Sequence, residues 1–184
     1  MLSVEYAHIP SVAYNNYVLR QHAIIIDADA SPSGYIAWYN HHTESSKIMS
    51  VRPALRNERF GVQRMGMLAV YFALRDNIAQ IRRTLRRASK KHLMIEVRSD
   101  SKSTVEQLRG VAEIRDLVMR RIVFVIGKLL AKIGCTTIVF DHLKRSRNIA
   151  GLMLEQGRRK EREKAIEMAS LRSPYRFAPL PLCA

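Results

Sequence analysis

Cysteine is scarce in this sequence, and long apolar runs are missing. Cys135 and Cys183 are too few for a disulfide framework or a structural zinc site, so we expect a reducing, intracellular setting. The cytoplasm or an organelle matrix, such as that of the mitochondrion, would provide it. The first twenty residues contain Arg20 as their single base and no long apolar segment, so we expect no secretory signal. The most apolar window, 122–126, is far too short to cross a bilayer.

Acidic residues are also few relative to basic ones. The 184 residues contain 31 lysines and arginines against 16 acids, which gives a formal charge of +15. Such an excess favours a polyanionic partner, and nucleic acid before membrane. With 47% hydrophobic residues, the chain can bury one sizeable core. We therefore expect one domain over 22–156, an N-terminal arm over 1–21, and a basic helix with an extended tail over 157–184.

The most informative stretch is IIIDADASPSGYIAWYN, residues 24–40. Its pattern predicts a buried strand that ends in carboxylates, a tight turn, and a neighbouring antiparallel strand. Aspartate is depleted in strands and costly to bury unpaired, so Asp27 and Asp29 need an explanation. Asp27 could simply start the turn. Alternatively, these carboxylates bind a metal at the centre of a sheet.

Further elements follow from the spacing of apolar residues. Strands are predicted over 45–52, 93–98 and 136–140, and helices from 64 to about 85 and over 104–109, 114–133 and 148–170. This order predicts an α/β fold, a five-stranded mixed sheet with helices on both faces. Asp29 and Asp100 would then end two strands that could be adjacent. His41 and His42 are expected in a solvated loop.

Basic residues form three clusters. The clusters are Arg82, Arg83, Arg86, Arg87, Lys90 and Lys91 at the end of the first long helix, Lys144, Arg145 and Arg147 before the last helix, and Arg158, Arg159 and Lys160 within it. Cations suit a helix C-terminus, but the first cluster exceeds what the helix end requires, so we expect phosphate contacts. No run of aromatic residues is arranged for base stacking, which favours recognition of shape and backbone.

Four motifs occur in an order that resembles the ribonuclease H superfamily, especially its retroelement branch. They are Asp29-Ala30-Ser31 with Gly34-Tyr35, the segment 65–74, Ser99-Asp100-Ser101, and the segment 142–148. The resemblance covers about residues 22–155. It implies a ribonuclease H-like fold.

The resemblance also implies a site in which four carboxylates hold two magnesium ions for phosphodiester hydrolysis. The first carboxylate falls on Asp29, with Asp27 as the less favoured register, and the third on Asp100. The second position is occupied by Gly66, and the fourth falls at 151–152, on Gly151 and Leu152. Two of the four ligands are thus missing.

Other acids could complete a metal site. Glu155 on the last helix would give a three-carboxylate set resembling that of transposases and integrases, and Asp141 could also approach. Asp100 could instead cap the following helix. With two carboxylates, we expect Asp29 and Asp100 to bind Mg²⁺ weakly, and no other cofactor is predicted.

Three functional hypotheses remain open. The favoured one is a catalytically degenerate ribonuclease H-like protein that binds RNA or an RNA-containing duplex in a ribonucleoprotein, such as a divergent or mitochondrial ribosome. The arm and the tail would contact other proteins, and no membrane is involved. The second is an active magnesium-dependent nuclease with a rearranged carboxylate set. The third is a protein-interaction subunit whose basic helices dock on an acidic protein.

Overall fold

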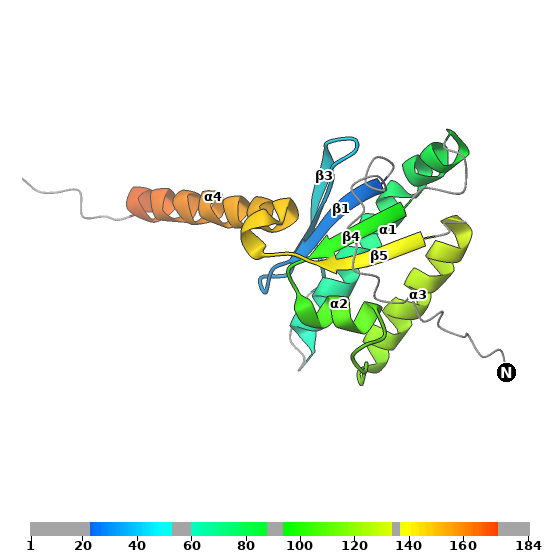
Figure 1. The fold of residues 1–184 in the computed structure, drawn as a ribbon. Coiled ribbons are helices and arrows are strands. Elements are labelled where there is room, and N and C mark those ends of the chain that lie inside the picture. Colours follow the sequence, from blue (N-terminus) through cyan, green and yellow to red (C-terminus); the bar gives the residue numbers. More distant parts are fainter. Residues whose placement is uncertain (1–22, 53–59, 88–93, 134–136, 173–184) are drawn as a thin grey trace, which may run out of the picture. The chain divides into compact units, whose positions relative to one another are not determined.

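A mixed sheet of five strands organises the molecule. The computed structural model describes residues 23–52, 60–87, 94–133 and 137–172. The strands are β1 (Ala23–Ala30), β2 (Tyr35–Asn40), β3 (Ser45–Ser50), β4 (Met94–Ser99) and β5 (Thr137–His142), in the order β3-β2-β1-β4-β5 (Figure 1). The first three form an antiparallel meander, and β4 and β5 continue it in parallel with β1. The predicted five-stranded mixed sheet is confirmed.

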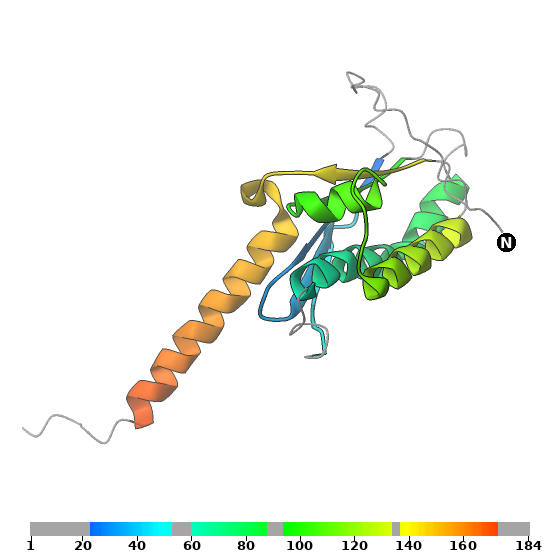
Figure 2. The same cartoon turned by 90° about the horizontal axis from the view of Figure 1, so that it is seen from below.

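Helices cover the sheet. They are α1 (Gly61–Arg87), α2 (Lys102–Leu108), α3 (Leu117–Ile133) and α4 (Ile149–Arg172). Figure 2 shows α1 and α3 side by side on the same face of the sheet. On the opposite face, Ala37 packs with Ala150 and Leu154 from the first turns of α4.

The alternation of β1 explains why its carboxylates are buried yet kept out of the apolar core. Successive strand residues point to opposite faces. Ile24, Ile26 and Ala28 belong to the core that includes α1. Asp27 and Asp29 therefore point to the other face of the sheet, where both are almost fully buried.

Three sequence-based predictions are wrong in detail. Asp27 does not start the turn, since it lies within β1 and pairs with Tyr39 of β2. The 114–133 helix begins only at Leu117, because Asp116 caps it by accepting a hydrogen bond from the Met119 amide at 3.1 Å. The fifth strand continues through residues 141–142, which pair with β4 instead of forming a loop.

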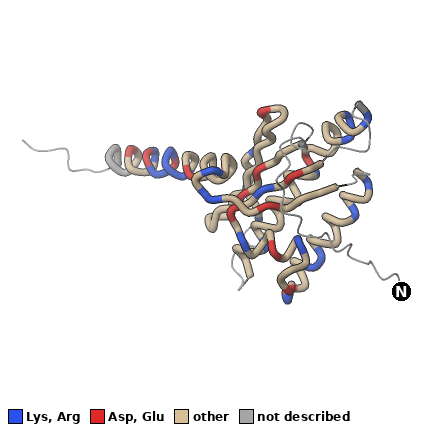
Figure 3. The backbone as a smooth tube through the Cα atoms, in the orientation of Figure 1, with Lys and Arg blue, Asp and Glu red and all other residues tan. Residues whose placement is uncertain are grey.

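The chain divides into two units, residues 1–154 and 155–184. In the second unit the structure describes the remainder of α4, which carries both basic and acidic residues (Figure 3). The proposed arm and the extended tail from residue 173 lie outside the described residues. None of the described helices is long and apolar enough to span a bilayer.

Candidate active site and basic surface

Two carboxylates meet where the central parallel strands end. The register of β1 and β4 pairs Asp27 with Arg98, so Asp29 and Asp100 come together two residues further along. Asp29 is 6% exposed, and the Asp100 side chain is 12% exposed. Burial, a hydrogen bond with Asp100 and the charge of that neighbour raise the pKa of Asp29 to about 7. The predicted pair is thus brought together, and Asp100 favours the protonated form of Asp29.

The surroundings of Asp29 leave little space on one side. Its Oδ1 accepts a hydrogen bond from the Ala30 amide at 2.7 Å. Its Oδ2 is buried and has no hydrogen-bond partner among the described residues. A Cβ added at Gly151 would lie only 2.8 Å from Oδ2. The backbone of α4 therefore approaches the carboxylate closely, and a side chain at 151 would have to displace it.

The position of the second expected carboxylate is also closed. A Cβ added at Gly66 would lie 2.6 Å from Oγ1 of Thr104, closer than real Cβ contacts allow. Thr104 is fully buried, and its hydroxyl lies 2.8 Å from the hydroxyl of Ser101. The first turn of α2 thus occupies the space that a side chain on α1 would need.

Of the other acids considered as ligands, one is already engaged and one belongs to the other unit of the chain. Asp141 forms an ion pair with Arg109 at 2.8 Å. Leu152, the neighbour of Gly151, is partly exposed and carries no ligand atom. Glu155 belongs to the second unit of the chain. In the described part of the chain, no three His, Cys, Asp or Glu side chains gather closely enough to hold a metal ion. The described residues therefore do not fit the four-carboxylate set that the resemblance implies.

Asp100 does not cap α2. The cap is Ser101, whose hydroxyl accepts a hydrogen bond from the Thr104 amide. Asp100 instead faces Arg145, whose Nη1 lies 4.0 Å from its Oδ2. The carboxylate is therefore available at the site, with a cation of the next loop beside it.

Asp27 is engaged in a buried polar cluster that the sequence analysis missed. Its Oδ1 accepts a hydrogen bond from Nε of Arg98 at 2.7 Å, and its Oδ2 lies 2.9 Å from Nε2 of His41. Nη2 of Arg98 also lies 2.6 Å from Nε2 of His41. His41 is half-buried and so is not the solvated residue that we expected, whereas His42 is exposed. The cluster satisfies a carboxylate that is itself 0% exposed.

The same cluster positions the start of α4. Oδ2 of Asp27 accepts a hydrogen bond from the Ile149 amide at 3.1 Å. Asn148, fully buried, donates from Nδ2 to the carbonyl of Ala28 at 3.3 Å and accepts from the Gly151 amide. These bonds link β1 directly to the first turn of α4.

Basic side chains lie next to this site and at the end of α1. Figure 3 shows basic residues at both places. Lys144, Arg145 and Arg147, in and around a 3-10 turn, are all exposed. At the end of α1, Arg83 and Arg86 are exposed.

Other members of the predicted basic clusters differ in what they contact. Arg82 donates from Nε to the Lys132 carbonyl at 3.2 Å and so helps to end α3. Lys90 and Lys91 lie outside the described residues, as does the Arg87 side chain. In the second unit, Arg159 and Lys160 are exposed and Arg158 is half-buried.

Comparison with known proteins identifies the fold. No protein-family model matches the sequence, and no curated protein matches it. Among solved structures, ribonuclease H1 of the halophilic archaeon Halobacterium salinarum is similar at 18% identity with a TM-score of 0.53, over 70% of this chain and 90% of that one. The N-terminal ribonuclease H domain of a Mycobacterium tuberculosis protein matches at 14% identity and a TM-score of 0.48, over 69% and 86% of the two chains. LC11 ribonuclease H1, isolated from compost and solved in complex with RNA/DNA hybrid, matches at 20% identity and 0.47, over 68% and 88%. The likeness to the archaeal protein shows a ribonuclease H-like fold.

Proposed function

We propose that this chain, with its ribonuclease H-like fold, binds RNA or an RNA-containing duplex without hydrolysing it. The observation that carries the proposal is that Gly66 and Gly151, which stand where two carboxylates are expected, have no room for a side chain, whereas Asp29 and Asp100 are present. Thr104 fills the space next to Gly66, and the backbone at Gly151 lies against Asp29. Two-metal hydrolysis needs ligands that hold both ions on either side of the scissile phosphate. Asp29 and Asp100 alone would bind Mg²⁺ weakly, since Mg²⁺ demands near-octahedral oxygen coordination.

Nucleic-acid binding is supported by charge and its distribution. The chain carries a formal charge of +15. Lys144, Arg145 and Arg147 are exposed in the loop after β5, and Nη1 of Arg145 lies 4.0 Å from Oδ2 of Asp100. A cationic loop can therefore contact phosphates at the place where a ribonuclease H-like site would present its ions. Such contacts recognise backbone and shape with little sequence preference.

We further propose that the protein serves as a structural component of a ribonucleoprotein, such as a divergent or mitochondrial ribosome, within an intracellular compartment. A binding function without hydrolysis fits such a role, because there the RNA must be held and not cut. The strongly basic composition supports this assignment.

The first experiment is a cleavage assay. Purified protein is incubated with labelled RNA–DNA hybrid, duplex RNA and duplex DNA in Mg²⁺ or Mn²⁺, beside an Asp100→Asn variant. We expect no cleavage by either protein. Metal-dependent cleavage that disappears in the variant would establish the alternative function, an active nuclease with a rearranged carboxylate set.

The second experiment measures binding of the same nucleic acids across a salt series. Replacing Lys144, Arg145 and Arg147 by alanine should weaken binding for all sequences and lower the slope of log affinity against log salt by about 2 to 3. The matched control replaces three exposed cations that already have acidic partners. They are Lys47, Lys102 and Arg115, paired with Asp76, Glu106 and Glu113. If both triple variants lose affinity equally, net charge alone explains the effect, and the loop is not the binding surface.

A further inference from the structure

The helix α3 has an unusual composition for a surface element. Apart from Gly127 and the four cations Arg120, Arg121, Lys128 and Lys132, every residue is apolar, and the helix contains no acid. One side packs into the domain through buried side chains that include Met119 and Ile126. A surface helix normally keeps its apolar residues on the buried side, yet Leu117, Phe124 and Val125 are exposed. The outer side of α3 is therefore the feature that needs an explanation.

A row of alternating apolar and cationic residues runs along that outer side. Leu117, Arg121, Phe124 and Lys128 follow one another at spacings of four, three and four residues, which places them on one helix face. Leu117 is 73% exposed and Phe124 is 58% exposed. Nζ of Lys128 lies 4.5 Å from the centre of the Phe124 ring. Leu117 and Phe124 are thus each followed by a cation four residues later on the same face.

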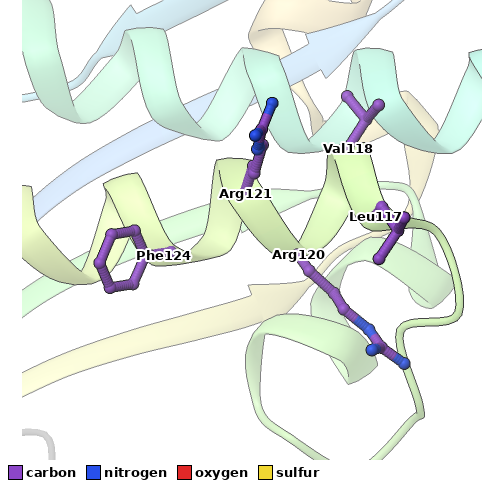
Figure 4. A pocket seen from close by; sticks show the side chains of 5 residues that line it. All are labelled: Leu117, Val118, Arg120, Arg121 and Phe124. Carbon is purple, nitrogen blue, oxygen red and sulfur yellow. The ribbon is translucent and has the colours of Figure 1, made fainter.

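The row borders an open cavity of about 510 Å³ lined by Leu117, Val118, Arg120, Arg121 and Phe124. Figure 4 shows Leu117 and Phe124 at opposite ends of this lining, with Arg120 and Arg121 between them and pointing to opposite sides. A ligand in this cavity would contact apolar groups along its length and cations at its margins.

The first turn of α3 is held rigidly. Asp116 forms a bidentate pair with Arg64 of α1, with Nε–Oδ2 at 2.7 Å and Nη2–Oδ1 at 2.8 Å, and both residues are buried. The other acid just before α3, Glu113, pairs with Arg115. These two acids are therefore engaged elsewhere and leave the cations of the outer row available to a ligand.

We propose that this face of α3 binds an amphipathic helix of another protein, one that carries acidic side chains beside apolar residues repeated every seven positions. Leu117 and Phe124 are seven residues apart, about 10 Å along the helix, which matches two turns of such a partner. Burial of Leu117 and Phe124 provides the favourable free energy, and acids next to the partner's apolar residues pair with Arg121 and Lys128. Phosphates of RNA would contact the cations but leave the leucine and phenylalanine exposed, so the apolar residues favour a protein partner.

The test uses the full chain and a labelled synthetic peptide about three heptads long, with leucine at the core positions and glutamate beside them. Two control peptides carry lysine in place of glutamate, or serine in place of leucine. We expect saturable binding of the acidic amphipathic peptide and at least about tenfold weaker binding of both controls. Equal binding of all three peptides, or no binding of the first, overturns the proposal.

Surface variants then locate the binding. Replacement of Leu117 and Phe124 by serine, or of Arg121 and Lys128 by glutamate, should each weaken peptide binding at least about tenfold. Val62→Ser is the matched control, because Val62 is 63% exposed on α1, and it should leave binding unchanged. Duplex RNA provides the second ligand. If the Leu117 and Phe124 variant weakens RNA binding as much as peptide binding, the face is a nucleic-acid surface and the proposal is wrong.

Discussion

The contact between Gly66 and Thr104 allows a direct test of how this site is closed. In an exposed helix, replacing glycine by alanine stabilises the protein by about 1 kcal/mol. At position 66 the new Cβ would lie 2.6 Å from Oγ1 of Thr104, and Thr104 is 0% exposed and cannot swing into solvent. Overpacking of this kind costs about 1–3 kcal/mol. Gly66→Ala should therefore change the free energy of unfolding by between about zero and a loss of 2 kcal/mol.

Thr104→Ala removes the colliding oxygen, and the next atom, Cβ of residue 104, would be 3.6 Å away, which is ordinary contact. In that background Gly66→Ala should stabilise the protein by about 1 kcal/mol. A double-mutant cycle measured by urea denaturation should thus give a favourable coupling of about 1–3 kcal/mol. Thr104→Val shows whether the effect of Gly66→Ala depends on the volume of residue 104 or on its hydrogen bond, because valine keeps two γ-branches and lacks only the hydroxyl. Gly66→Ala should remain unfavourable there.

Gly127→Ala is the matched control for this cycle. Gly127 lies inside α3, and a Cβ there would meet nothing within 4 Å. This variant should stabilise the protein by about 1 kcal/mol in every Thr104 background. If Gly66→Ala behaves in the same way as Gly127→Ala in all backgrounds, Thr104 does not fill the space beside Gly66 and our argument about the missing ligand is wrong.

Three further predictions concern buried charges. Because the pKa of Asp29 is raised from 3.8 to about 7, the folded state binds more protons between these values, and its stability falls as the pH rises across that range. Asp29→Asn should therefore gain stability relative to the wild type from about pH 4 to pH 7 in urea titrations, and a constant difference would refute the assignment. Arg98→Met should destabilise the protein by about 3–5 kcal/mol, since it leaves Asp27 buried without its cation. If the variant unfolds at the same temperature as the wild type, Arg98 does not stabilise the buried Asp27. Asp116→Asn should lower the free energy of unfolding by a similar amount at pH 7. The loss should shrink as the pH falls from about 4 to about 2, because Arg64 lowers the pKa of Asp116 from 3.8 to about 2. A loss that does not vary with pH would contradict the ion pair as its cause.

Much of the fold could be predicted because each element has its own local signal. Strand alternation, helical spacing and element order led to the five-stranded mixed sheet, and the ends of two strands led to the meeting of Asp29 and Asp100. What escaped prediction depends on contacts between distant segments. Thr104 lies beside Gly66 only because α2 packs near α1, and the local sequence of neither helix predicts that contact.

The Asp27 cluster shows that a missed interaction can still have a sequence signal. Side chains two apart in a strand share a face, so Asp27 must accompany Asp29, and Arg98 must accompany Asp100. Once β1 and β4 are predicted to be adjacent, an arginine beside a buried aspartate follows directly. His41 could not be found this way, because it lies beyond the end of β2 and reaches Asp27 through the path of the turn.

The two carboxylates of β1 have separate structural surroundings. Asp27 is satisfied by Arg98 and orders the first turn of α4 through the Ile149 amide, so this junction depends on protein groups alone. Asp29 contributes little to it, since its Oδ2 accepts no hydrogen bond from a described donor. Replacement of Asp29 should therefore leave the start of α4 in place. The hydrogen bonds that hold the start of α4 are thus separate from Asp29, the carboxylate that the resemblance to ribonuclease H assigns to metal binding.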